Sequence, residues 1–253
     1  PYLEIFQPSL YSLIKMMLVG LPMDSDRVQE VHTILAAKEK ALNEQIQENN
    51  YVNTFNYVLQ VEACTKANAK LKKLVKTTKD FRDIKFNPSS HPQLAKLLFE
   101  TLNLPVLDKT KSGAPATSAD VLKDLENHTT DTDILDLLKF VRDLSEVCKI
   151  NGTFIKAFMQ EKDFLHGNLK LGGTQSGRLA SNSPNLTNLP AHGFMGKLIK
   201  SCIAAPEGWL FAGADFSALE ERIGAILSKD PNRIKVYTDG YDGHSLRAQT
   251  YFA

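Results

Sequence analysis

Cysteine is scarce in this sequence. Its 253 residues include three cysteines, with no Cys-x-x-Cys pair and no histidine cluster beside them. This spacing indicates neither a disulfide framework nor a zinc site, and it suits a reducing compartment. The chain also has no uninterrupted apolar run near the roughly 20 residues that cross a bilayer, and no basic-then-apolar signal at its N-terminus. We therefore expect a soluble protein of the cytoplasm with no membrane partner.

A strong excess of one charge is absent as well. The 30 basic and 29 acidic residues nearly balance, which argues against a protein that holds nucleic acid by bulk charge and leaves only local patches for such contacts. Hydrophobic residues make up 43% of the chain, enough for one large or two modest cores. The chain lacks an initial methionine and stops at Ala253 without a helix breaker, so we expect a piece of a longer protein.

Periodic apolar residues predict helices over the first 150 residues. Behind a predicted N-cap at 24–26, the first helix repeats them at Val28, Val31, Leu35, Leu42 and Ile46. The second places on one face Tyr57, Val61, Cys64, Leu71, Leu74 and Val75. The two predict a helical hairpin joined across 47–54. Further helices are predicted at 94–102, after an N-cap at Ser118, and at 134–150 with an inward face of Leu137, Leu138, Val141 and Leu144.

Basic residues gather near the end of the second predicted helix. Eight lie between residues 66 and 85, against two acidic ones, and among them are Lys70, Lys72, Lys73 and Lys76. From charge alone, such a cluster fits a solvated helix face. It also fits a grip on a phosphate backbone, which needs mobile cations but no base-reading groups.

The character of the chain then changes, and we place a domain boundary near residue 160. A partly alternating run at 164–171 is strand-like, and a stretch rich in Gly, Ser, Asn and Pro follows at 172–190. Irregular chain of that length is usually functional or disordered. The apolar run 209–214 predicts a short buried strand that ends at Asp215, with a helix from Ser217 to Leu227.

Four polar residues in this second part each have an ordinary structural interpretation. Asp215, at the exit of a rigid strand, could ligate a hard divalent cation or merely close the strand. Glu220 completes a capping-box pattern that begins at Ser217. Arg178 fits an ordinary surface loop residue as well as a ligand contact. His244, in the run D-G-H-S, could simply start a helix.

The order of these signals resembles a known family. Residues 173–190 read G-T-Q-S-G-R-L-A-S-N-S-P-N-L-T-N-L-P, similar to T-G-R-L-S-S-x-x-P-N-L-Q-N-I-P, a signature of family A DNA polymerases. Residues 214–222 read A-D-F-S-A-L-E-E-R, which resembles motif A of that family, D-Y-S-Q-I-E-L-R. The D-G-H at 242–244 resembles the D-I-H that follows motif A.

Upstream segments resemble thumb motifs of the same family. These segments are F-N-P-S-S at 86–90, G-A-P-A-T-S at 113–118 and G-L-P-M-D at 20–24. The resemblance thus spans nearly the whole chain, and it looks closest to bacteriophage enzymes. It implies an α+β fold, in which a helical thumb subdomain over 1–160 is followed over 161–253 by the first part of a palm with an antiparallel sheet. If the source is viral, the expected compartment is the host cytoplasm.

The resemblance implies template-directed DNA synthesis. In that reaction two Mg²⁺ ions assist transfer of a nucleotide from a dNTP to a primer 3′-hydroxyl. Asp215 would ligate both ions, and the carbonyl of Phe216 would add an oxygen ligand. Glu220 would lie beneath the incoming sugar and exclude a ribose 2′-hydroxyl, in competition with its capping interpretation. His244 would donate to the incoming triphosphate.

Contacts to primer-template DNA are implied in both parts. Arg178 would reach minor-groove acceptors that every correct base pair presents, with Asn185 and Asn188 beside the same duplex. The resemblance also favours the phosphate grip for the basic cluster and a duplex contact for the F-N-P-S-S run. The implied DNA-binding residues are therefore Arg178, Asn185, Asn188, Lys70, Lys72, Lys73, Lys76, Ser89 and Ser90.

Some of the family pattern is altered or missing. Phe216 and Ala218 replace the Tyr and Gln of motif A, and Thr187 replaces the Gln of P-N-L-Q, which leaves that minor-groove contact open. The fingers helix and the His-Asp-Glu segment with the second metal carboxylate are not in this sequence. We therefore expect a chain that is inactive alone and acts with the remainder of a polymerase, in the same or another chain. The alternative is a non-catalytic module that binds primer-template duplex.

Overall fold

The structure is a computed structural model that describes residues 2–69, 75–190 and 192–252. Two compact units make up the chain, residues 1–206 and residues 207–253. This division reflects packing within each unit, and the thumb and palm boundary near residue 160 stays a prediction.

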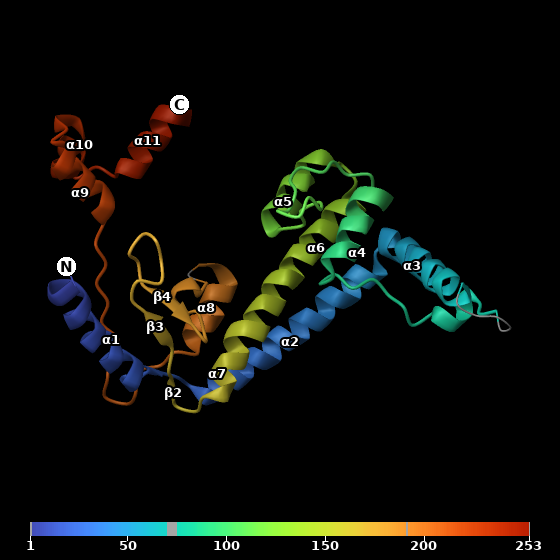
Figure 1. The fold of residues 1–253 in the computed structure, drawn as a ribbon, viewed down its shortest axis with the longest axis horizontal. Helices are drawn as coiled ribbons and strands as arrows, with labels where there is room; N and C mark the ends of the chain where they lie inside the picture. Colours follow the sequence, from blue (N-terminus) through green and yellow to red (C-terminus); the bar gives the residue numbers. More distant parts are fainter. Residues whose placement is uncertain (1, 70–74, 191, 253) are drawn as a thin grey trace. The chain divides into compact units, whose positions relative to one another are not determined.

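Helices dominate the first unit (Figure 1). Its helices and helical turns are η1 (Tyr2–Phe6), α1 (Gln7–Val19), α2 (Ser25–Glu48), α3 (Asn50–Asn68), η2 (Thr78–Phe81), α4 (His91–Ala95), η3 (Lys96–Thr101), α5 (Ala119–Leu125), η4 (Glu126–His128), α6 (Thr132–Lys149), η5 (Ile150–Ile155), α7 (Lys156–Gln160), η6 (Leu186–Asn188) and α8 (Gly193–Ser201). The second unit contains α9 (Leu219–Ser228), α10 (Pro231–Thr238) and α11 (Gly243–Phe252).

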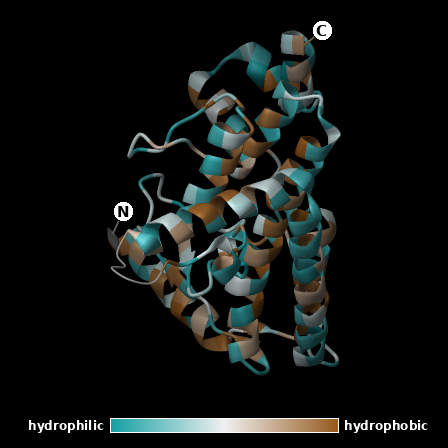
Figure 2. Cartoon of the chain, turned by 90° about the vertical axis from the view of Figure 1, so that its right-hand side faces the viewer, coloured by the Kyte–Doolittle hydropathy of each residue, from teal (hydrophilic) through white to brown (hydrophobic). Residues whose placement is uncertain are grey.

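The core of the first unit lies between α2 and α6, which pack against each other. Figure 2 shows brown apolar and teal polar residues alternating around the long helices, as amphipathic helices require. The buried side chains are Val28, Val31, Leu35, Leu42 and Ile46 of α2, and Ile134, Leu137, Leu138, Val141, Leu144 and Val147 of α6. Both predicted inward faces are confirmed. Full burial of each such side chain is worth about 1.5–3 kcal/mol.

Side-chain caps begin the helices where the sequence predicts them. The Asp24 carboxylate accepts from the backbone N–H of Arg27 at 2.9 Å and begins α2. The Ser118 hydroxyl accepts from the N–H of Val121 at 3.4 Å and begins α5. These acceptors satisfy amides that have no partner inside the helix. The helix predicted at 94–102 is present as α4 and η3, with Leu94, Leu97 and Leu98 buried.

Asn49 alone joins α2 to α3. Its backbone N–H donates to the carbonyl of Ile46 at 3.3 Å, and its side-chain oxygen accepts from the N–H of Tyr51 at 3.0 Å and of Val52 at 3.4 Å. One residue therefore ends the first helix and caps the second, because Asn satisfies the amides of the new first turn. The longer polar connection predicted at 47–54 is wrong.

The buried face of α3 also differs from the prediction. Val52, Phe55 and Cys64 are buried, whereas Tyr57 is 60% exposed. The reason is the position of the packing partner, since the Phe55 ring meets the Phe86 ring edge-on with centroids 5.8 Å apart. Apolar residues occur on two sides of this helix, and the periodic pattern does not tell which side a distant segment covers. Leu71 and Leu74 lie outside the described residues.

Two small antiparallel sheets complete the first unit. β1 (Leu21–Pro22) pairs with β2 (Phe164–Leu165), and β3 (Asn168–Lys170) pairs with β4 (Ala180–Asn182). Asn168 pairs with Asn182, and Lys170 with Ala180. The helix-rich α+β class with antiparallel sheets is thus confirmed. The strand-like run at 164–171 forms two short strands separated by His166 and Gly167.

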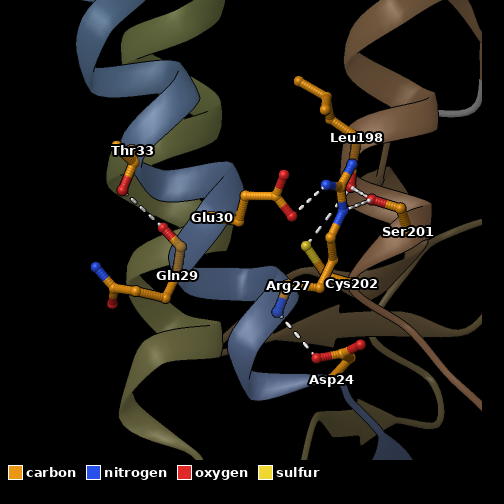
Figure 3. Close-up of polar contacts among 8 residues, drawn as sticks. All are labelled: Asp24, Arg27, Gln29, Glu30, Thr33, Leu198, Ser201 and Cys202. Carbon is orange, nitrogen blue, oxygen red and sulfur yellow. Dashed lines mark hydrogen bonds and ion pairs between the residues drawn. The ribbon is translucent and has the colours of Figure 1, made fainter.

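Arg27 connects the start of α2 to the end of α8 by a hydrogen bond (Figure 3). Its guanidinium donates to the Ser201 hydroxyl at 2.9 Å and to the Glu30 carboxylate at 2.5 Å. The backbone N–H of Asp24 donates to the carbonyl of Cys202 at 2.9 Å. Cys202 is buried, and burial raises the pKa of its thiol to about 11, so it stays a neutral packing group at neutral pH. This joint anchors the long helix α2 at one end.

The strand predicted at 209–214 is absent from the second unit. This segment has no regular secondary structure, and Trp209, Leu210 and Phe211 are 72%, 93% and 57% exposed. A strand exists only where neighbouring chain satisfies its backbone groups, and the described residues supply no such neighbour here. The helix predicted from Ser217 begins at Leu219.

Candidate nucleic-acid and nucleotide interface

Arg178 lies in the connection between β3 and β4. The hydroxyl of Thr174 donates to the backbone carbonyl of Arg178 at 2.7 Å, and the N–H of Gly177 donates to the carbonyl of Thr174 at 3.3 Å. Gly177 has φ +76°, a left-handed conformation that favours glycine. The turn therefore carries Arg178 on a paired hairpin, with its side chain exposed.

A buried serine folds the chain directly after β4. The hydroxyl of Ser181 donates to the carbonyl of Pro184 at 3.1 Å and accepts from the N–H of Leu186 at 3.2 Å. This bend leads into η6, which carries Asn188, and Asn185 stands just before it. Leu186 packs so closely on Gly167 that a Cβ there would lie 2.5 Å from its Cδ1. The predicted minor-groove residues therefore share one hairpin and the turn that follows it.

Thr187, the departure from the family pattern, contacts one of these residues. Its hydroxyl donates to the side-chain oxygen of Asn185 at 2.7 Å, and the N–H of Asn188 donates to the carbonyl of Asn185 at 3.2 Å. With its oxygen engaged in this way, the amide of Asn185 has N–H donors to offer a minor-groove acceptor. Sequence reasoning missed this contact.

The basic cluster surrounds η2. Its described members are exposed, and they are Lys66, Lys76, Lys79, Arg82 and Lys85. The backbone of Lys76 is held by Asn68, whose side chain accepts from its N–H at 2.7 Å and donates to its carbonyl at 2.8 Å. The Lys76 ammonium lies 5.6 Å from the centroid of the Phe81 ring. Lys70, Lys72 and Lys73 lie outside the described residues.

Ser89 and Ser90 form a turn that leads into α4. The backbone N–H of Ser89 donates to the Asn87 side chain at 3.0 Å, and that of Ser90 donates to the Asn87 carbonyl at 2.9 Å. The ring of His91 bonds the Thr117 hydroxyl at 2.9 Å. Pro88 and Ser89 of the first segment and Thr117 of the second line one cavity of about 140 Å³. The sequence indicated both segments without indicating that they line one cavity.

Asp215 and Phe216 lie in a segment without regular secondary structure before α9, and both are exposed. The Arg222 side chain donates to the backbone carbonyl of Ser217 at 2.9 Å, which ties this segment to the first turns of the helix. Ala218 occupies the N-cap in a left-handed conformation, with φ +50°. The capping box predicted from Ser217 to Glu220 is therefore wrong, because the residue at the N-cap has no side-chain oxygen.

His244 lies in the first turn of α11. The Asp242 carboxylate accepts from the N–H of His244 at 3.1 Å and from the hydroxyl of Ser245 at 2.6 Å. The Ser245 hydroxyl and, next, the His244 N–H lower the pKa of the Asp242 carboxyl. The interpretation of His244 as a helix-start residue is confirmed. Its side chain is exposed, so it is also accessible to a ligand.

The predicted residues thus divide between the two units. Arg178, Asn185, Asn188, Ser89, Ser90 and Lys76 belong to the first, and Asp215, Phe216, Glu220 and His244 belong to the second. Over residues 2–69, 75–190 and 192–252, no three His, Cys, Asp or Glu side chains gather in a way that could hold a metal ion. The oxygen donors of Asp215 and Phe216 are still of the type that Mg²⁺ takes, since it commonly binds one or two carboxylates together with substrate phosphates.

A family model described as DNA polymerase family A matches residues 59–253. The chain belongs to DNA polymerase family A. This family A chain is 34% identical over 189 residues to DNA polymerase I of Bacillus subtilis, which covers 73% of the chain and 21% of that relative. It is 36% identical over 173 residues to the thermostable DNA polymerase I of Thermus aquaticus, which covers 66% of the chain and 20% of that relative.

The fold is also that of a solved polymerase domain. The POL domain of Pol1 from M. smegmatis, in complex with DNA primer-template and dNTP, superposes with a TM-score of 0.72 at 24% identity, over 97% of this family A chain and 37% of that one. The chain spans about a fifth of the length of the curated relatives above. These relatives are bacterial, and the closer likeness to bacteriophage enzymes stays a prediction. Among the helices of the described residues, none is long and apolar enough to span a membrane.

Proposed function

We propose that this chain forms part of a DNA polymerase that extends a primer 3′-hydroxyl with deoxynucleotides under the direction of a template. The observation that carries this proposal is the family match over residues 59–253. That range contains the T-G-R-L-like run, motif A and the D-G-H segment. Any one of these motifs alone would be explained by an ordinary structural role of its residues. The three motifs in this order together support DNA synthesis.

Asp215 and the carbonyl of Phe216 would hold magnesium in this proposal. When bound, two magnesium ions would lower the pKa of the primer hydroxyl and neutralise charge on the triphosphate. The exposure of Asp215 leaves its carboxylate accessible. His244 would donate a hydrogen bond to the triphosphate from the first turn of α11. Glu220 would lie beneath the sugar, where its side chain takes the space of a 2′-hydroxyl.

The first unit would hold the primer-template. Arg178 and the amide donors of Asn185 and Asn188 would contact minor-groove acceptors, which check the shape of a base pair without reading its sequence. The basic cluster around η2, together with Ser89 and Ser90, would contact phosphates. The exposure of the described basic residues Lys66, Lys76, Lys79, Arg82 and Lys85 supports this assignment, because a phosphate contact needs a cation that can reach the DNA backbone.

We further propose that the chain acts together with fingers and a remaining palm, in the same or another polypeptide, and is inactive without them. The chain covers 37% of the M. smegmatis POL domain chain. One carboxylate and one carbonyl do not complete a two-metal site. The exposed apolar side chains of Trp209, Leu210 and Phe211 support an apolar partner, since large apolar groups are usually covered in a complete assembly.

Reconstitution tests this function. The chain is mixed with a polypeptide that carries the fingers and the second metal carboxylate, and primer extension is measured with and without Mg²⁺. The expected result is magnesium-dependent extension that Asp215→Ala abolishes and that Asp239→Ala, an exposed aspartate of the same unit, leaves intact. Duplex binding with no extension in any mixture would instead support a non-catalytic primer-template binding module.

A further inference from the structure

One ion pair connects the segment that carries Glu220 to the helix that carries His244. The Nη1 of Arg247 on α11 lies 2.8 Å from the Oε1 of Glu221 on α9. The Nε of Arg247 also donates to the carbonyl of Gly243 at 3.0 Å. Arg247 therefore binds the backbone at the start of its own helix and the side chain of a neighbouring helix at once.

Contacts from α10 support the same arrangement. The Arg222 guanidinium lies 4.9 Å from the centroid of the Tyr237 ring. Tyr237 also contacts α11 closely, because a Cβ added to Gly243 would lie 2.9 Å from its hydroxyl. Figure 1 shows α9 and α10 lying together and α11 extending from them. Glu221 and Arg247 thus pair α9 with α11 directly.

The position of the pair in the sequence relates it to the proposed nucleotide site. Glu221 directly follows Glu220, and Arg247 lies three residues after His244, so it shares a side of α11 with that histidine. Glu221 also stands where the motif A pattern D-Y-S-Q-I-E-L-R has leucine. The pair is therefore a feature of this chain that the family pattern does not contain.

We propose that Glu221 and Arg247 are positioning residues, which hold His244 in a fixed relation to Asp215 and Glu220. This inference rests on the proposed function. Under that function, three groups act on one nucleotide, at its metal, its sugar and its triphosphate, and the rate depends on their mutual placement. The Glu221 and Arg247 side chains are 33% and 45% exposed, and an ion pair so exposed contributes little to folding stability. Its effect on activity should therefore be separable from unfolding.

Both partners are charged at the pH of catalysis. The hydrogen bond from Arg247 lowers the pKa of the Glu221 carboxyl, and Arg247, Arg233 and His244 add to this through their charge. Glu221 therefore stays ionised throughout the neutral range, and the pair persists whenever the helices are in place.

Hydrogen exchange in the chain itself tests the positioning without any activity. We expect Glu221→Gln and Arg247→Gln each to accelerate exchange of the amides at 246–250 several-fold, while amides of α6 stay unchanged. Glu44→Gln is the matched control, because it removes the carboxylate of an exposed pair with Lys40 that lies within one helix. Unchanged exchange over 246–250 in both variants would overturn the proposal.

Primer extension with the reconstituted enzyme tests the consequence. Each single variant should lose about tenfold in kcat/KM for the dNTP, below the roughly hundredfold loss of a 1 Å misplacement, with unchanged affinity for primer-template. The double variant should lose no more than either single variant, because the two residues act through each other. Additive losses or wild-type kinetics would overturn the proposal. If the unaltered mixture fails to extend primer, the proposed function is refuted, and so is the role of the pair in placing a nucleotide. Hydrogen exchange then still tests whether the pair of Glu221 and Arg247 holds α11 in place.

Discussion

Leu210→Ala is expected to leave the folding stability of the chain almost unchanged and to weaken its assembly with the rest of a polymerase. Leu210 is 93% exposed, so its side chain contributes almost nothing to the folding stability of the chain. The same exposure leaves nearly all of its apolar surface available for burial against a partner. This one substitution should therefore leave the free energy of unfolding unchanged and raise the Kd of assembly.

The size of the effect follows from the atoms that are removed. Leucine to alanine deletes three carbons, and each buried CH₂ is worth about 0.8 kcal/mol. Full burial in the assembly therefore gives a loss of about 2.4 kcal/mol, which is roughly a fiftyfold rise in Kd. Partial burial lowers this value in proportion.

Two measurements test the reasoning. Urea denaturation followed by circular dichroism gives the stability of the chain, and calorimetric titration with a polypeptide carrying the fingers and remaining palm gives Kd. Leu137→Ala is the control, since Leu137 is fully buried and should cost about 2–5 kcal/mol of folding stability. If Leu210→Ala lowers the urea midpoint, or leaves Kd unchanged, the segment 209–211 does not act as an assembly surface.

Three further outcomes are expected. In the reconstituted enzyme, Glu220→Ala should raise ribonucleotide use relative to dNTP at least about tenfold in competitive primer extension, whereas an unchanged ratio removes Glu220 from sugar selection. Replacing Lys70, Lys72, Lys73 and Lys76 by alanine should weaken duplex binding and reduce its salt slope by about 0.9 for each phosphate that a lysine no longer neutralises, and an unchanged slope contradicts the phosphate grip. The Tyr51 hydroxyl donates to Asp131 at 2.5 Å, lowers the pKa of that carboxyl, and has its own pKa raised by it. The stabilisation should therefore be fully present between about pH 4 and pH 10, and be lost as pH falls through the lowered pKa of Asp131 or rises through the raised pKa of Tyr51. Asp131→Asn should accordingly lower the thermal midpoint most near neutral pH, and an equal loss at about pH 3 would contradict this assignment.

The sequence predicted the features that depend on residues close together in the chain, namely the buried helix faces and the helix caps. The buried faces of α2 and α6 follow from the spacing of residues such as Leu35 and Leu138, because a helix that packs on one side must repeat its apolar residues at that period. The caps at Asp24 and Ser118 follow from an oxygen placed one turn before an apolar run. The candidate residues came from ordered motifs, whose spacing is visible in the sequence.

The features that the sequence did not predict depend on contacts between residues that are far apart in the chain. The run 209–214 has the composition of a strand, yet it is exposed, because a strand needs neighbouring chain that the described residues do not supply. The face of α3 that is buried depends on Phe86, which no periodicity within α3 can indicate. The pair between Glu221 and Arg247 joins positions 26 residues apart, and charge at those positions alone does not predict that they meet.

The hydrogen bonds of Arg27 fix one end of a long helix, α2. The 24 residues of α2 span about 36 Å, with the α8 contact at one end and the start of α3 at the other. A tilt of about 5° at the fastened end would move the far end by about 3 Å, the length of one hydrogen bond. A small change in the hydrogen bond between Arg27 and Ser201 would thus displace the start of α3 by a larger distance.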